Sequence, residues 1–202
     1  MITISSLDQS KISYQVIKKL HLECLPSDII PNLSNLHYQF IYEMLQDNEQ
    51  AYSVAAFYEH ELVGIGAIVF DPGAFYKKMM LLKKNVISSI FNIIFTAPMV
   101  FVYILSIFLL RGKQYQSECP EIFCLFIKSQ YRGRGIGKMM IDAMHYKIFD
   151  KFQAITTKTS DEKSKNFYLN AGYKLISHEY RGVRKMYVLI KNLNEKNSVR
   201  ND

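Results

Sequence analysis

The stretch that decides the fold is QYRGRGIGK, Gln130 to Lys138, which contains three alternating glycines: Gly133, Gly135 and Gly137. It follows the apolar run EIFCLFI (121–127), which predicts a buried strand, and it opens a segment with helical periodicity over 135–150. Glycines at a strand-to-helix junction let backbone N–H groups point toward one place, and the helix N-terminus adds a positive dipole. Such a junction predicts an anion site.

The cations around this loop indicate which anion it binds. Arg132, Arg134 and Lys138 surround the glycines, which favours a diphosphate over a single carboxylate. The phosphate-binding loop of the Walker type is excluded, because Met139 follows Lys138 where a serine or threonine is required. The dinucleotide fingerprint is also missed, since the third glycine comes one residue early.

The loop resembles the coenzyme A loop of the GNAT superfamily of N-acetyltransferases, in which Gln or Arg is followed by two residues, Gly, one residue, and Gly or Ala. Gln130-Tyr131-Arg132-Gly133-Arg134-Gly135 matches that motif, and Ile136-Gly137 extends the match. Downstream, Asn166-Phe167-Tyr168 and then Gly172-Tyr173 are similar to the aromatic–tyrosine pair and Gly-Phe of the family. The resemblance covers about residues 121–173.

This resemblance implies an α/β (α+β type) acyl-CoA N-acyltransferase fold with a mixed, mostly antiparallel sheet flanked by helices. It implies acetyl transfer from acetyl-CoA, as cosubstrate and without a metal, to a primary amine by direct attack. The residues that it assigns to coenzyme A binding are Leu125, Ile127, Gln130, Arg132, Gly133, Arg134, Gly135, Ile136, Gly137, Lys138 and Asn166. One departure is Asp161, where many members carry Asn.

Two catalytic residues follow from the same resemblance. Tyr168 is expected to protonate the departing thiolate, with a structural aromatic as the alternative. Glu121 is the preferred base for the amine, directly or through water, because the pleat of a strand fixes its direction, whereas Glu118 lies in a polar loop. A solvated surface charge is the alternative for both glutamates. Arg181 and Arg184 near the last turn either meet an acidic substrate or are solvated.

The remaining pattern predicts one domain over 1–192 and a polar tail over 193–202. Strands are expected at 2–5, 51–58, 62–70, 154–159, 173–180 and 184–191, and a short helix at 163–170. Two amphipathic helices are expected before residue 46. Their apolar faces carry Ile12, Val16, Ile17 and Leu20, and then Leu36, Phe40, Ile41, Met44 and Leu45.

An apolar insert, 74–110, interrupts this pattern, and its segment 86–110 has no charged residue. That length would suffice to span a bilayer. However, the strands on either side are expected to belong to one sheet, and both flanks are cationic, so a helical hairpin lying on the membrane is predicted. A dimer interface or packing against the domain is the alternative. The insert resembles those of GNAT-like proteins from bacterial envelope polysaccharide pathways, which implies a lipid-linked or envelope-precursor amine acceptor.

Composition sets wider limits. The 202 residues carry a formal net charge of +7, which suits an anionic partner, but no helix has a basic face interleaved with aromatics, so nucleic acid is not expected. Three cysteines without metal-ligand spacing suggest buried free thiols in a reducing cytosol. The N-terminus lacks a secretory signal, so a cytoplasmic protein, peripheral at the inner face of the membrane, is expected. A non-catalytic acyl-CoA sensor or partner-binding module is the alternative function, and a homodimer is possible.

Overall fold

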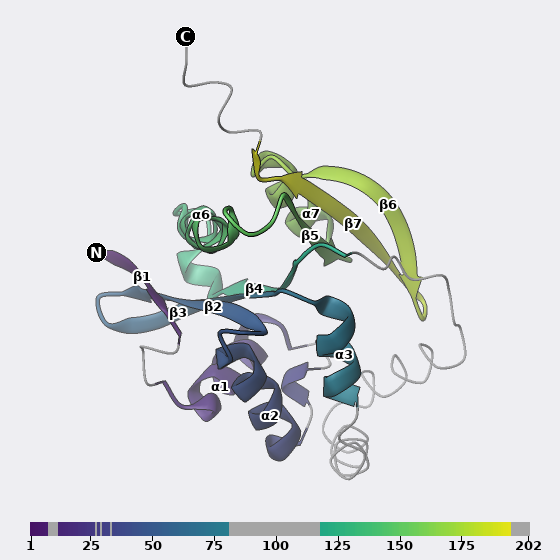
Figure 1. Ribbon diagram of the computed structural model, residues 1–202. Helices are drawn as coiled ribbons and strands as arrows, with labels where there is room; N and C mark the ends of the chain where they lie inside the picture. The colour runs from purple at the N-terminus through teal and green to yellow at the C-terminus, as the bar shows by residue number, and fades with distance from the viewer. Residues whose placement is uncertain (8–11, 27, 29, 33, 81–117, 195–202) are drawn as a thin grey trace.

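The computed structural model describes residues 1–7, 12–26, 28, 30–32, 34–80 and 118–194, and it contains a seven-stranded mixed sheet (Figure 1). The order of the strands is β1-β2-β3-β4-β5-β7-β6. The strands are β1 (Ile2–Ser6), β2 (Ala51–Tyr58), β3 (Glu61–Val69), β4 (Glu121–Ile127), β5 (Ala154–Thr159), β6 (Lys174–Arg181) and β7 (Arg184–Asn192). The helices are α1 (Tyr14–Cys24), α2 (Asn35–Gln46), α3 (Pro72–Met80), α6 (Ile136–Ile148) and α7 (Glu162–Asn170).

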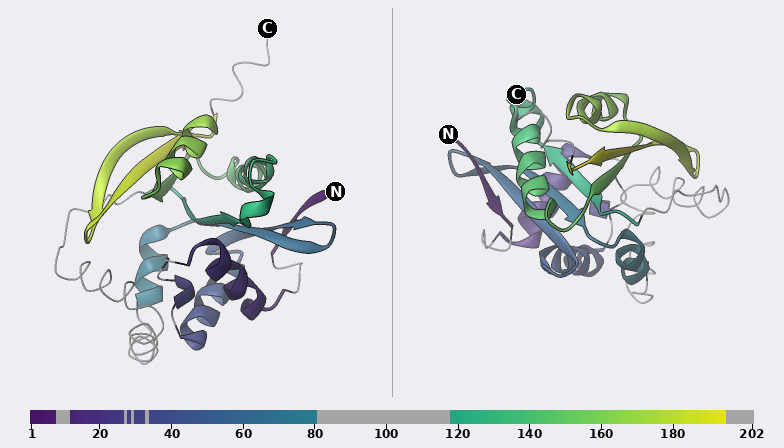
Figure 2. Two further views of the ribbon diagram at one scale, coloured as in Figure 1. Left: turned by 180° about the vertical axis from the view of Figure 1, so that it is seen from behind. Right: turned by 45° about the horizontal axis from the view of Figure 1, so that its top comes forward.

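The helices cover both faces of the sheet. Figure 1 and Figure 2 show α1, α2 and α3 on one face, and α6 and α7 on the other. The core on the α6 side contains Met140, Met144 and Ile148 of α6, all fully buried. On the opposite face, α2 and α3 pack one cluster against the sheet and α1 packs another. The predicted fold class, a mixed sheet flanked by helices, is confirmed.

Local capping explains where two of the helices begin. The side chain of Ser34 accepts a hydrogen bond from the His37 backbone N–H at the start of α2. The Asp161 carboxylate accepts one from the Ser164 N–H, at 2.8 Å, at the start of α7. This hydrogen bond holds the pKa of Asp161 below its usual range. Asp161, the departure from the family motif, therefore serves as a helix cap.

Two residues expected to point inward do not. Val16 is 50% exposed and Leu36 is 64% exposed. In α1 the buried face is formed by Ile17, Leu20 and His21. Successive side chains of an α-helix point in directions about 100° apart, so Val16, next to Ile17, faces away from the sheet. Leu36 lies in the first turn of α2 and is not among the residues of that helix that are buried. The buried face of α1 thus includes a histidine, which hydrophobic periodicity does not detect.

The sequence pattern does not predict helix α3, because most of its residues fall within the apolar insert 74–110. It begins at Pro72, a position where proline's missing N–H costs nothing. Phe75 is 2% exposed and packs with the α2 cluster. The first residues of the 74–110 insert therefore belong to the globular core. The rest of the insert, from 81, lies outside the described residues, as does most of the tail; no helix of the described part is long and apolar enough to cross a membrane.

Strands β4 and β5 are parallel, whereas the other neighbouring strands of the sheet are antiparallel. These parallel strands pair at Glu121 with Thr156 and at Ile122 with Thr157, and beyond those positions the described strands do not pair. On its other edge β4 pairs with β3, where the register shifts so that Phe123 is an extra residue between Ile122 and Cys124. The bulge and the end of the β4–β5 pairing fall at the same place, near the start of β4, and the rest of β4 leads from there to the glycine loop.

Candidate active site

The glycine loop has the backbone expected of an anion site. Gly133 and Gly135 lie in the left-handed region with φ of 75° and 79°, and a Cβ built on either would meet nothing within 4 Å. Gly135 is the N-cap of α6, and Ile136 beyond it is 1% exposed, which anchors the helix start in the core. The loop therefore leaves the positive end of α6 accessible and unobstructed.

Gly137 has a different environment from the other two glycines. A Cβ there would lie 3.0 Å from Cζ of Phe167 and 3.4 Å from Cδ1 of Ile127. Its position in the first turn of α6 thus allows α7 to approach closely. This packing is a sufficient reason for glycine at 137, whatever the loop binds.

Each predicted loop cation has a contact within the described residues. Arg132 donates from Nε to the Ile127 carbonyl at 2.9 Å, and it also reaches the Cys24 carbonyl at the end of α1. The Arg134 guanidinium lies over the ring of Tyr131 at 5.5 Å. Lys138 pairs with Asp142 one turn along α6, at 2.7 Å. All three side chains are exposed, so a bound anion can still attract them.

Glu61, at the start of β3, holds the loop in place, a role that sequence reasoning missed. Its carboxylate accepts hydrogen bonds from Lys128 Nζ at 2.6 Å and from the Tyr131 hydroxyl at 2.7 Å. These two donors keep the pKa of Glu61 below its usual range, so the contacts persist as pH falls through the ordinary carboxylate range. Lys128 and Tyr131 flank the segment that enters the loop.

The other predicted cofactor-binding residues lie around the same region. Leu125 and Ile127 of β4 pack against the α6 core. Gln130 is exposed beside Tyr131, with which its side chain forms a hydrogen bond. Asn166 is exposed on α7. The structure thus brings the predicted residues of β4, the loop and α6 together, with Asn166 on the neighbouring helix.

Tyr168, the predicted acid, is buried on the α7 face of β5. It is 6% exposed, forms a hydrogen bond with the Thr157 side chain, and packs edge-on to Tyr173 with ring centroids 5.3 Å apart. Burial raises the pKa of Tyr168 to about 12. The hydroxyl is therefore protonated at neutral pH, as a proton donor must be, and Thr157 places it beside the last paired position of β4 and β5.

Glu121, the predicted base, is not a solvated surface charge, since it is 3% exposed. One carboxylate oxygen accepts a hydrogen bond of 2.8 Å from the hydroxyl of Tyr76 on α3. The other lies 3.7 Å from Lys158 Nζ on β5. Burial and the Glu121 charge raise the pKa of Tyr76 well above its usual value, so Tyr76 remains the donor. Glu118, the alternative base, is exposed at a bend before β4.

Glu121 belongs to a ring of mostly buried polar and charged side chains. Lys158 Nζ also lies 3.5 Å from Glu179 on β6, and Glu179 lies 3.7 Å from Arg181. Arg181 in turn forms a hydrogen bond with Tyr76, which closes the ring. The sequence predicts that Arg181 either meets an acidic substrate or is solvated; in the structure its side chain is 29% exposed and takes part in this ring. A lone lysine in the β-branched strand AITTKT was the available signal for Lys158.

The two predicted catalytic groups approach the parting of β4 and β5 from opposite faces of the sheet. Tyr168 packs in the α6–α7 core together with Ile122, whereas Glu121 meets Tyr76 of α3. Within the described chain they share no hydrogen bond. The arrangement places the Tyr168 hydroxyl on one face of the sheet and the Glu121 carboxylate on the other, near the position where β4 and β5 stop pairing.

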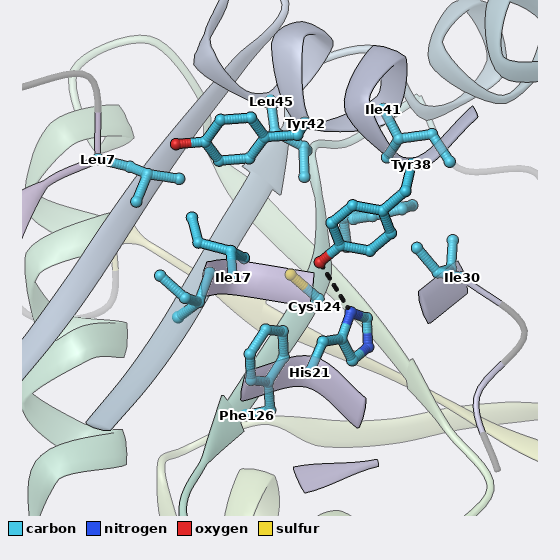
Figure 3. Close-up of a pocket in the computed structure, with 12 residues that line it drawn as sticks. Leu7, Ile17, His21, Ile30, Tyr38, Ile41, Tyr42, Leu45, Cys124 and Phe126 are labelled. Atoms are coloured by element: carbon cyan, nitrogen blue, oxygen red, sulfur yellow. Dashed lines mark hydrogen bonds between the residues drawn. The ribbon is translucent and has the colours of Figure 1, made fainter. Parts of the chain in front are cut away.

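A small cavity of about 20 Å³ lies elsewhere, between the sheet and α1 and α2 (Figure 3). His21, Tyr38, Tyr42 and Cys124 are among the residues that line it, and Tyr38 Oη lies 3.5 Å from His21 Nδ1. This volume holds about one water molecule. The cavity is too small for a substrate and is distinct from the glycine loop.

All three cysteines are free and partly exposed, so the expectation that they are buried is wrong.

Comparisons with known proteins agree with this geometry. Residues 101–175 match the family model of the acetyltransferase (GNAT) domain. No curated protein sequence matches the chain. Among solved structures, a GNAT-family acetyltransferase of Desulfovibrio desulfuricans has a TM-score of 0.59 at 8% identity, covering 96% of this chain and 99% of that one.

Two further structures share the fold. The PaiA N-acetyltransferase of Thermoplasma acidophilum, solved in complex with coenzyme A, has a TM-score of 0.58 at 11% identity, covering 95% of this chain and 99% of that one. The ribosomal-protein-S18-alanine N-acetyltransferase of Escherichia coli has a TM-score of 0.58 at 8% identity, covering 96% and 94%. This chain therefore has the fold of the GNAT acetyltransferases, and the segment that contains β4, the glycine loop, α6, β5 and α7 matches the model of their domain.

Proposed function

We propose that the protein is an acetyl-CoA-dependent N-acetyltransferase that acts on a primary amine. The observation that carries this proposal is the placement of Tyr168 and Glu121 on opposite faces of the sheet where β4 and β5 part. The glycine loop supports it, because Gly133 and Gly135 leave backbone N–H groups and the start of α6 open to a diphosphate. The residues present thus fit coenzyme A.

The chemistry asked of the protein is small, because the thioester is already activated. The amine nitrogen attacks the carbonyl carbon, a C–N bond forms and the C–S bond breaks. Glu121 takes the proton from the amine and releases it to solvent, and Tyr168 gives its proton to the departing thiolate and recovers one from solvent. Holding amine and thioester in register supplies about 7 kcal/mol or more of the reduction in barrier.

The proposal is tested by measuring thiol release from acetyl-CoA with a panel of amino sugars, peptides and polyamines. The expected result is thiol release that depends on the amine, with an acetylated product detected by mass spectrometry. Binding of acetyl-CoA without turnover across the panel would instead support a non-catalytic acyl-CoA sensor. Glu121→Gln measures the role of the carboxylate, since it keeps the shape of the side chain and removes its charge.

Glu61 provides a prediction about the loop. Glu61→Gln should raise the Kd for acetyl-CoA about threefold to tenfold, because it weakens the charge-assisted hydrogen bonds to Lys128 and Tyr131. The rate at saturating acetyl-CoA should not change. Calorimetry measures the affinity. Glu59→Gln is the matched control, because Glu59 is an exposed glutamate of the turn between β2 and β3, and its carboxylate lies 3.9 Å from the N-terminal amine. Equal affinities in the two variants would contradict this role for Glu61.

We further propose that the acceptor is a lipid-linked or envelope-precursor amine and that the insert associates with the inner face of the cytoplasmic membrane. The support comes from the sequence of 81–117, which lies outside the described residues: 86–110 has no charge, and cations flank it. Replacing residues 83–110 by a short Gly/Ser bridge should move the protein from the membrane pellet to the soluble fraction and preserve acetyl-CoA binding. An intact protein that is monomeric without detergent and does not float with anionic liposomes would contradict it.

A further inference from the structure

The ring of buried side chains around Glu121 calls for a physical explanation. It consists of Tyr76, Glu121, Lys158, Glu179 and Arg181, which come from α3, β4, β5 and β6. The side chains of Glu121, Lys158 and Glu179 are each less than one tenth exposed. Burying such ions is expensive, and well-packed apolar residues often stabilise a fold as well or better. Stability alone is therefore a weak reason for the ring.

The ring's position points to a role in the reaction. Lys158 follows Thr157, the last residue of β5 that pairs with β4, so it lies where the two strands part. Its ammonium lies between two carboxylates, 3.7 Å from Glu121 and 3.5 Å from Glu179. One oxygen of Glu121 is held by Tyr76 and the other faces Lys158. Both oxygens of the carboxylate are thus fixed by neighbours from separate elements.

We propose that Lys158 is a positioning residue for Glu121, which holds the carboxylate in place and compensates its charge where the acceptor amine loses a proton. The inference rests on the proposed function. Without the ammonium, Glu121 would be a buried carboxylate with no ion pair to a residue of the described chain, a state that is strongly unfavourable. Glu179 keeps Lys158 from turning away, and Arg181 balances Glu179 and joins the site to the β6–β7 hairpin.

The test is a double-mutant cycle of Lys158→Met and Glu121→Gln. Lys158→Met should lower kcat on the order of 10²-fold and leave the Kd for acetyl-CoA unchanged, because Lys158 acts through the base. In the Glu121→Gln background the same substitution should cause no further loss, because the charge that Lys158 compensates is already gone. Lys158→Arg, which keeps the charge, should restore most of the activity.

Controls separate this role from a structural one. Lys147→Met removes an exposed charge on α6, where the ammonium lies over Tyr52, and it should leave kcat unchanged. If Lys158→Met does not fold, Lys158→Gln replaces it in the cycle. Losses of kcat that multiply in the double variant, or wild-type kcat in folded Lys158→Met, would overturn the proposal. Acetylated Lys158 in mass spectra after incubation with acetyl-CoA would also overturn it, since Lys158 would then be an acceptor.

The same experiment distinguishes a failure of the proposed function from a failure of the role of Lys158. A wild-type protein with no amine-dependent turnover overturns the proposed function and this role together. A wild-type protein that turns over, with a Lys158→Met variant that does so equally well, overturns the role of Lys158 alone.

Discussion

Replacing Gly135 by valine is expected to abolish acetyl-CoA binding, with a rise in Kd of about 100-fold or more. The N-cap of α6 has a φ of 79°, and the space over its α-carbon is open. A branched side chain would fill the space in which phosphate oxygens must approach the backbone N–H groups. The substitution also carries backbone strain of about 1–3 kcal/mol, because a β-branched residue rarely adopts the left-handed region.

The strain and the loss of the anion site are separated by a matched variant. Gly182, in the β6–β7 turn, also has a positive φ, of 61°, and lies on a different element from the loop. Gly182→Val should therefore lower the free energy of unfolding and retain acetyl-CoA affinity. Calorimetry and thermal unfolding measure the two quantities, and Gly135→Ala provides a milder change if the valine variant does not fold. Wild-type affinity in a folded Gly135→Val protein would show that the loop does not bind the diphosphate.

Replacing Tyr168 by phenylalanine is expected to lower kcat by a factor on the order of 10² and to leave the Kd for acetyl-CoA close to that of the wild type. A proton donor acts mainly in the transition state, while the ring keeps its contacts with Phe167 and Tyr173. The pKa of about 12 keeps the hydroxyl protonated throughout the usual assay range. The variant should accordingly show the same dependence on pH below 10 as the wild type.

Tyr173→Phe is the matched control for this prediction. Tyr173 packs against Tyr168, is 2% exposed, and its hydroxyl lies 2.8 Å from His145 Nε2. Removing that hydroxyl should cost about 1 kcal/mol of stability, because a buried hydrogen bond is lost, and should leave kcat unchanged. Equal turnover of Tyr168→Phe and wild type, measured where chemistry limits the rate, would show that Tyr168 is a structural aromatic.

Local patterns in the sequence were sufficient for most of the fold. Alternation and apolar runs predicted all seven strands, with ends displaced by one residue at most, and the glycine loop located the junction between β4 and α6. Such signals act over a few residues and hardly depend on the rest of the chain. Helix α3 could not be recognised in this way. Phe75 is apolar because it packs against the core, but in the sequence it is continuous with a long apolar segment, and the two cases have the same local pattern.

The sequence by itself determined which residues form the glycine loop, and the motif it resembles led to Tyr168 and Glu121. The tertiary structure alone decided that Glu121 is buried, that Tyr76 and Lys158 hold its two oxygens, and that Glu179 and Arg181 complete the ring. These residues are distant along the chain and meet because α3, β4, β5 and β6 pack together. A charged side chain in a strand has no local sign of its partner, since the partner is set by the pairing of the sheet, and that pairing is a property of the whole fold.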